Sequence, residues 1–216
     1  MSSIRFTNAT VWHGEGTESS EITVRNGVIA RDDAPVDEEF DCDGGFIMPA
    51  FADGHAHPVF GGLEQQFAAV RGCSSIDEIA DAVRNWAAAH PDAEWIRGEG
   101  FDPSLAPAGE FHAQWLDVAI PDRPVALRAM DYHTFWVNSE ALRRVGYTNG
   151  VTQPIDGEIV LLADGSPMGT LREWGAWGPV QAAFGPLAQT DAIAALSYAS
   201  RQYAAAGLTY VQDAWV

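Results

Sequence analysis

The sequence contains no lysine, because all 12 of its basic residues are arginines. This absence excludes a Schiff-base lysine, a Walker-type phosphate loop and a carboxylated-lysine metal bridge from these 216 residues. Cysteine is also scarce: Cys42 and Cys73 are too few for a disulfide framework, and they lack the spacing of a zinc ribbon or a redox motif. We expect both to be small residues of the hydrophobic core.

Long hydrophobic runs are missing as well. No stretch approaches the roughly 20 uninterrupted apolar residues of a membrane span, and the first ten residues lack the basic and apolar regions of a secretory leader. We therefore expect a soluble, cytoplasmic protein. Its 30 acidic residues give a formal net charge of −18, which disfavours nucleic acids and anionic membranes as partners because both bind basic patches. The expected partner is a small-molecule substrate.

The first quarter of the chain has the pattern of a small β unit. Residues 4–12 alternate as a strand does, and residues 21–30 predict a hairpin in which Asn26-Gly27 forms a type I′ turn. The run at residues 44–53 (GGFIMPAFAD) is too apolar to alternate. We predict that it is buried on both faces and that its second half is the first central strand.

Helix caps and glycines divide the rest of the chain. Ser75 and Glu78 form a capping box before a helix that ends at Pro91, and Gly146 closes a short helix at residues 138–145. Strands are predicted at residues 94–101, 124–130 and 208–216. Between them, Thr190 is expected to cap a long helix that Gly207 ends and whose packed face carries Ile193, Leu196, Ala199, Tyr203 and Ala206. A rhythm of helix, glycine and strand is typical of an α/β protein with parallel strands.

The strongest chemical feature is the pair His55 and His57, separated by one residue at the end of the apolar run. On a strand, a period of two places both imidazoles on one face. Two neutral imidazoles form half of a zinc-type site, and a bound metal would activate water for hydrolysis. A His-x-His pair also occurs by chance, but its position matches the carboxyl end of a barrel strand, where (β/α)₈ enzymes carry out their chemistry.

These residues carry a resemblance to a known family. Residues 45–57 (GFIMPAFADGHAH) resemble the signature G-x-x-x-P-G-(F/L)-x-D-x-H-x-H of the amidohydrolase superfamily, with Ala50 in place of the usual glycine. Four later blocks resemble one branch, which includes the YtcJ-like proteins and the N-substituted formamide deformylases. These blocks are residues 95–102, 116–125, 133–142 and 164–173.

The resemblance implies an α/β fold: the N-terminal part of a metal-dependent (β/α)₈ barrel, with a small flanking β-sandwich and an α+β insertion after the first barrel strand. Residues 1–43 would belong to the sandwich and residues 44–59 to the first barrel strand. Residues 60–170 would form the insertion, and residues 171–216 would begin the remaining barrel. A barrel alone needs on the order of 250 residues, so we expect it to be incomplete in this chain. Three explanations stay open: the chain is a fragment of a longer enzyme, it is a truncated reading frame, or a partner chain supplies the rest of the barrel. A homo-oligomer also stays open.

The resemblance also implies which residues form the site. His55 and His57 would bind one or two divalent ions, with zinc expected, and Glu173 would be a third ligand because family members often bridge their metals with a glutamate or a carboxylated lysine. The alternative for Glu173 is a solvated side chain on the first turn of a helix. His133 would bind substrate, or else be a packed, hydrogen-bonded histidine. Asp213 is a further candidate for the active-site mouth, whereas Asp102 and His112 are expected to be structural and His13 and His90 to lie on the surface.

The function implied for the full-length protein is metal-dependent hydrolysis of a carbon–nitrogen bond in an amide, formamide or cyclic imide. The family's remaining ligands, including the aspartate that moves the proton, come from later strands, so the isolated 216 residues should be inactive or nearly so. Two alternatives stay open: a catalytically inactive fragment with a binding or regulatory role, and a deaminase of the same superfamily.

Overall fold

The computed structural model describes residues 2–214 and divides into two compact units. The first unit extends to His55 and includes Tyr203–Gln212, while the second comprises Ala56–Gln202 and the residues from Asp213 on. Each unit is described by itself. The four-part division proposed from the sequence (1–43, 44–59, 60–170 and 171–216) stays a prediction.

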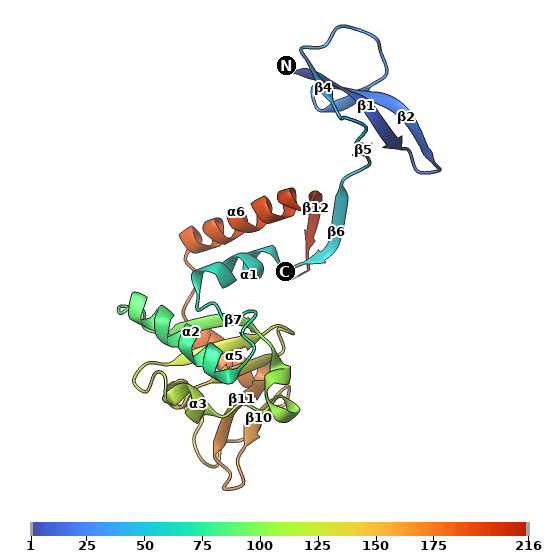
Figure 1. Cartoon of the computed structure of the whole chain (residues 1–216). Coiled ribbons are helices and arrows are strands. Elements are labelled where there is room, and N and C mark those ends of the chain that lie inside the picture. The colour runs from blue at the N-terminus through green and yellow to red at the C-terminus, as the bar shows by residue number, and fades with distance from the viewer. Residues whose placement is uncertain (1, 215–216) are drawn as a thin grey trace. The chain divides into compact units, whose positions relative to one another are not determined.

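The first unit contains a sheet in the order β3-β2-β1-β4, with β5 also paired to β1 (Figure 1). Its hairpin turn has positive φ angles at both central residues, 52° at Asn26 and 80° at Gly27, which confirms the predicted turn. The strands are β1 (Ser3–Trp12), β2 (Thr17–Arg25), β3 (Val28–Ala30), β4 (Glu38–Asp41) and β5 (Phe46–Ile47).

A separate two-stranded sheet pairs β6 (Phe51–Ala56) with β12 (Leu208–Asp213). The prediction that residues 44–53 are buried on both faces is wrong for this chain, since Phe46 is 57% exposed and Phe51 is 56% exposed. A strand becomes buried on both faces when layers cover its sheet. Within residues 2–214, β6 pairs with β12 alone and remains largely exposed.

The second unit is built on a five-stranded sheet in the order β10-β11-β9-β8-β7. In this sheet only β7 and β8 run parallel, and the other neighbours are antiparallel. The sheet of the first unit contains the parallel pairs β1–β4 and β1–β5. The expectation of parallel strands therefore holds for only one pair of the second unit's sheet. The short connection between β8 and β9 makes a hairpin, which requires antiparallel strands. The strands are β7 (Ile96–Phe101), β8 (Val125–Ala129), β9 (Thr134–Val137), β10 (Glu158–Leu161) and β11 (Pro167–Arg172).

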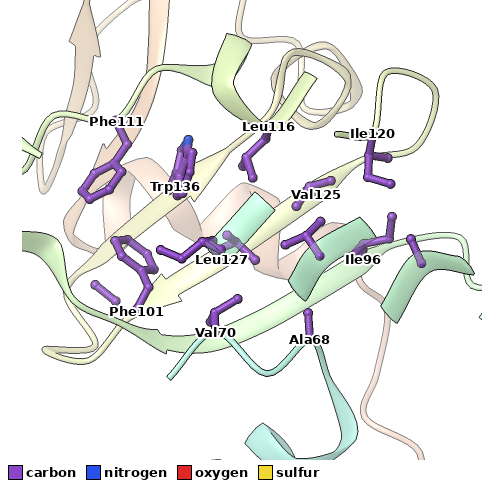
Figure 2. Packing of buried hydrophobic residues seen from close by; sticks show 14 of the residues in the cluster. Ala68, Val70, Ile96, Phe101, Phe111, Leu116, Ile120, Val125, Leu127 and Trp136 are labelled. Carbon is purple, nitrogen blue, oxygen red and sulfur yellow. The ribbon is translucent and has the colours of Figure 1, made fainter. Parts of the chain in front are cut away.

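A hydrophobic cluster covers each face of this sheet. Successive side chains of a strand point to opposite faces, so neighbouring residues of one strand enter different clusters. Trp136 belongs to one hydrophobic cluster and Phe135 to the other. Figure 2 shows the first cluster, in which Phe101, Phe111 and Trp136 point toward one another. The second cluster packs beneath α4 and α5 and contains Trp177.

Helices cover these faces and begin where local capping predicts. Ser75 accepts a hydrogen bond from the N–H of Glu78 (3.1 Å) at the start of α2, and Asn138 accepts one from Ala141 (3.0 Å) at the start of α4. The carboxylate of Glu78 accepts from the backbone of Ser74 and not from Ser75, so only half of the predicted capping box forms. The helices of this unit include α1 (Pro58–Leu63), α2 (Ile76–Ala89), α3 (Ala113–Asp117), α4 (Ser139–Arg144) and α5 (Glu173–Ala183), with 3₁₀ turns at Glu64–Gln66, Pro103–Leu105 and Pro107–Gly109.

The long helix α6 (Gln189–Ala205) lies against α1 (Figure 1). A β-carbon at Gly62 would lie 2.1 Å from the carbonyl oxygen of Ala195, so the two helices approach at backbone distance. This contact corrects two predictions. Ala195 is buried whereas Ile193 is 59% exposed and Leu196 is 47% exposed, because small residues and not large ones permit the approach. Thr190 lies inside the helix rather than at its cap, and its hydroxyl bonds to Asp191.

Two expectations from composition have structural outcomes. Cys42 and Cys73 are both partly exposed, although Cys73 packs against the first hydrophobic cluster. No helix between residues 2 and 214 is both long enough and apolar enough to cross a membrane.

Candidate functional site

His55 and His57 flank the end of β6. His55 is an exposed residue of the strand, and its backbone N–H donates to the Asp53 carboxylate at 2.9 Å. His57 follows the strand directly and is the residue before the first turn of α1, whose first position is Pro58. Proline is favoured there because it needs no hydrogen-bond acceptor. The strand therefore ends and the helix begins around the two candidate ligands.

Asp213 lies beside His57, at the last position of β12. Its Oδ1 atom is 3.9 Å from Nδ1 of His57. The sequence suggested Asp213 only as a further candidate for the mouth of the site, and the structure brings this carboxylate next to one of the two imidazoles. The 3.9 Å distance exceeds hydrogen-bond length, so the contact between these two atoms is electrostatic.

Aromatic rings form the other side of the His57 environment. The ring centroid of His57 is 6.2 Å from that of Phe60 and 5.9 Å from that of Tyr132. The Tyr132 hydroxyl donates to Glu64 (2.9 Å), which also accepts two hydrogen bonds from Arg71. Burial and the charge of Glu64 raise the pKa of the Tyr132 phenol, so it remains protonated. Sequence reasoning missed this contact, because 68 residues separate Tyr132 from Glu64.

His133 and Glu173, which were expected in different roles, contact each other. Nδ1 of His133 is 3.1 Å from the Glu173 carboxylate, and the N–H of Glu173 donates to the carbonyl of His133 at 2.9 Å. Strand register explains the meeting, since Thr134 of β9 pairs with Arg172 of β11. Glu173 has a φ of 63°, which is unusual for a residue with a side chain. Both side chains are more than half exposed.

Charged side chains are buried nearby in the second unit. Glu99 is 4% exposed and Arg128 is 3% exposed, while Arg97 lies 3.6 Å from Glu99. Burial raises the pKa of the Glu99 carboxyl, and the positive charges of Arg128 and Arg97 oppose this effect. Burial likewise lowers the pKa of both guanidinium groups, which remain charged because their ordinary pKa is so high.

The metal prediction can be tested against this geometry. The donor types fit, since imidazole nitrogens and carboxylate oxygens are the ligands that zinc and related ions take in hydrolases. Among residues 2–214, however, no three His, Cys, Asp or Glu side chains converge closely enough to hold an ion. The roles of His55 and His57 as metal ligands therefore stay predictions, as do those of Glu173 and His133.

The other polar candidates have local roles. Asp102 caps the 3₁₀ turn at Pro103–Leu105 by accepting from the N–H of Ser104 (2.8 Å), as expected for a structural residue. The imidazole of His90 stacks on Trp86 with ring centroids 4.1 Å apart. His112 lies against Trp115, at 4.9 Å between centroids.

Comparison with known proteins agrees with the motif resemblance. The model of the amidohydrolase family matches residues 38–216. The chain is 29% identical over 180 residues to the putative amidohydrolase YtcJ of Bacillus subtilis (strain 168), a match covering 74% of this chain and 34% of that protein. It is 29% identical over 189 residues to the N-substituted formamide deformylase of Arthrobacter pascens, covering 85% of this chain and 35% of that enzyme.

A solved structure shares the fold. An uncharacterized metal-dependent hydrolase from Pyrococcus furiosus superposes with a TM-score of 0.61 and 21% identity, over 97% of this chain and 43% of that one. The chain spans about a third of the length of the two curated relatives above.

Proposed function

The chain belongs to the amidohydrolase family, and from this premise we propose that the full-length protein is a metal-dependent hydrolase of carbon–nitrogen bonds other than peptide bonds. Its expected substrate is an amide, a formamide or a cyclic imide. The observation that carries the proposal is the His55–His57 pair around the end of β6, inside the segment that the family model matches, with Asp213 beside His57.

In this proposal His55 and His57 hold a divalent ion, with zinc expected, through neutral imidazole nitrogens. When bound, such an ion polarises a carbonyl and lowers the pKa of its water to about 7. Asp213 places a negative charge beside the His57 ring, and the rings of Phe60 and Tyr132 limit the access of water to it.

Glu173 and His133 have proposed roles as a third metal ligand and a substrate contact. Their support is the 3.1 Å contact between them and the positive φ of Glu173, since residues held in rare backbone conformations cluster at functional sites. Hydrolysis is expected from the full-length protein and not from these residues alone, because no three ligands converge in the described part of the chain.

We extend the proposal to the architecture: β6 is the first strand of a (β/α)₈ barrel and residues 60–170 form an insertion over its mouth. The support is that β7 through β11 form a sheet of their own, separate from β6 and β12. A cytoplasmic location, the number of ions and a homo-oligomer or partner chain stay predictions.

Elemental analysis tests the metal assignment. The full-length protein is purified without a histidine tag, and bound zinc, iron and manganese are measured beside a His55→Ala/His57→Ala variant. A His13→Ala/His90→Ala variant is the matched control, because it also removes two histidines. The expected result is near-stoichiometric metal in the parent and the control, and none in the His55/His57 variant. Equal metal content in all three proteins would overturn the assignment.

Activity of the full-length protein tests the reaction. It is expected to release formate from an N-substituted formamide or an acid from an amide, and to lose this activity with a chelator. Metal binding without hydrolysis of any amide, formamide or imide would favour the catalytically inactive alternative. Release of ammonia from an aminated ring in place of these products would favour the deaminase.

A further inference from the structure

The second unit contains a cavity of about 280 Å³ between the edge of its sheet and the segment that joins α5 to α6. Two arginines from neighbouring strands face it, Arg97 of β7 and Arg128 of β8. The rest of the lining is mostly apolar and includes Phe60, Leu63, Phe184 and Leu187. A small cavity that combines apolar side chains with a few charged groups is the usual form of a site for a small molecule.

Arg128 is buried without enough hydrogen-bond acceptors. Its Nη2 donates to the side chain of Gln181, but Nε and Nη1 have no hydrogen-bond partner among the described residues. Rings surround the guanidinium at 4.9 to 5.7 Å and attract its charge, but they do not accept its N–H groups as an oxygen does. Buried donors without acceptors cost free energy, so an oxygen ligand at this position is favoured.

Arg97 provides the second guanidinium group of the cavity. Its guanidinium lies between the rings of Phe67 and Phe184, at 4.0 and 4.4 Å from their centroids. The nearest carboxylate, that of Glu99, is 3.6 Å away, which is too far for a strong hydrogen bond. Stacking fixes the plane of the group and leaves its edge of N–H donors available, and this planar fork matches the two oxygens of a carboxylate.

Two acidic groups lie near these cations. Glu99 is buried, and one of its oxygens also has no hydrogen-bond partner in the described part of the chain. Asp191 is an exposed residue of the lining, where solvent screens its charge. Neither acid accepts a hydrogen bond from Arg97 or Arg128, so these donors remain in excess within the cavity.

The cavity lies close to His57, the candidate metal ligand, because Phe60 contacts both. Phe60 lines the cavity and contacts His57 at 6.2 Å between ring centroids. Tyr132 is 5.9 Å from His57 and 5.7 Å from the Arg128 guanidinium. A molecule held by the two arginines would thus extend along Phe60 toward His57.

We propose that Arg97 and Arg128 bind a carboxylate of the substrate, so that the substrate is an amide with an acidic group at one end and an apolar body. This inference rests on the proposed hydrolase function. The carboxylate would accept hydrogen bonds from the two guanidinium groups, and the apolar body would pack on Phe60, Leu63 and Phe184.

Binding of benzoate and benzamide to the metal-free chain tests the cavity without any catalysis. The two probes have the same shape and differ in charge. By isothermal titration calorimetry, benzoate is expected to bind at least about tenfold more tightly than benzamide, because charge-assisted hydrogen bonds are roughly twice as strong as neutral ones. Arg128→Lys keeps the charge but loses the planar fork, and it should weaken benzoate binding about tenfold. Arg84→Lys is the matched control, since Arg84 is exposed and pairs with Asp81; it should change nothing.

Circular dichroism verifies that each variant is folded. Equal affinity for the two probes, or equal benzoate affinity in the Arg128→Lys and Arg84→Lys variants, would overturn the carboxylate site. A second arm uses the full-length enzyme with two formamides, one bearing a carboxylate and one neutral. A preference for the acidic formamide that Arg128→Lys abolishes supports a substrate site, whereas no preference overturns that assignment even if benzoate binds. Hydrolysis without benzoate binding leaves the hydrolase intact and rejects only this inference.

Discussion

The two sheets that bear on function differ sharply in burial. In the five-stranded sheet, every residue of β8 and β9 is buried, and hydrophobic clusters cover both faces. In the two-stranded sheet, Ala56 is the one buried residue of β6 and β12, although β6 contains His55 and ends just before His57. Apolar burial contributes about 25 cal/mol per Å². The clusters on the sheet of β7 to β11 should therefore contribute more to the free energy of folding than the sheet of β6 and β12 does. The candidate chemistry begins at the second.

This difference can be tested by comparing substitutions in the two regions. The largest loss of stability is expected for Trp136→Ala, because Trp136 is fully buried among Phe101, Phe111 and Trp115. Removing such a ring should lower the free energy of unfolding by about 3–5 kcal/mol. Urea denaturation measures the change, with Trp174→Ala as the control because Trp174 is 56% exposed. Similar losses in both variants would contradict the assignment of the core.

A smaller loss is expected where α1, which follows β6, touches α6, which precedes β12. Gly62→Ala would force a β-carbon against the Ala195 carbonyl and should cost about 1–3 kcal/mol of unfolding free energy. Gly61→Ala is the matched control, because it is the same substitution at the neighbouring position and a β-carbon there meets nothing within 4 Å. It should be neutral or slightly stabilising, because alanine favours a helix. Thermal unfolding of the pair decides: equal melting temperatures would refute the close helix contact.

A third substitution concerns pH and the surface of the second unit. Hydrogen bonds from Arg143 and Arg144 lower the pKa of Glu140 from 4.5 to about 2. A lowered carboxyl pKa contributes stability that is present above about pH 4.5 and is lost as the pH falls toward 2. Glu140→Gln should therefore destabilise the chain at pH 7, by less than about 1 kcal/mol because the pairs are near the surface. The difference from the parent should shrink as the pH falls from 4.5 toward 2, and a difference that grows on acidification would contradict this sign.

The smallest effect on stability is expected at the candidate site itself. His55 is exposed on β6, so His55→Ala should change the free energy of unfolding by less than about 0.5 kcal/mol in the presence of a chelator. The same substitution should remove bound metal. Guanidinium denaturation and elemental analysis of one preparation measure both quantities. If His55→Ala greatly lowered the free energy of unfolding in the presence of the chelator, His55 would have a structural role and would not be only a metal ligand.

Most predictions that depended on neighbouring residues were confirmed, although the cap at Thr190 was wrong. The Asn26-Gly27 turn, the cap at Ser75 and the glycine that ends α4 (Gly146, φ 76°) form as expected. Each follows from backbone conformation or from a side chain that reaches a donor a few residues away. The histidine motif was equally local, and the family match agrees with it.

Predictions about which surface is buried succeeded less well. The packed face of α6, the burial of residues 44–53 and the direction of the strands around β9 all depended on partners distant in the sequence. Hydrophobic periodicity indicates that a face is apolar, but it does not identify what covers that face. The small residues Gly62 and Ala195 determined the face of α6, and large residues such as Ile193 were left exposed.

The sequence by itself identified the family, most of the turns and caps, and the position of His55 and His57 at the end of a strand. Each of these features depends on residues that are close together in the sequence. Only the tertiary structure decided which side chains meet. Strand register brought His133 to Glu173, and the ends of β6 and β12 brought Asp213 to His57. The cavity brings Phe60 of α1 and Gln181 of α5 together with Arg97 and Arg128 of the sheet. These contacts join residues tens to more than a hundred positions apart, where no local pattern specifies the partner.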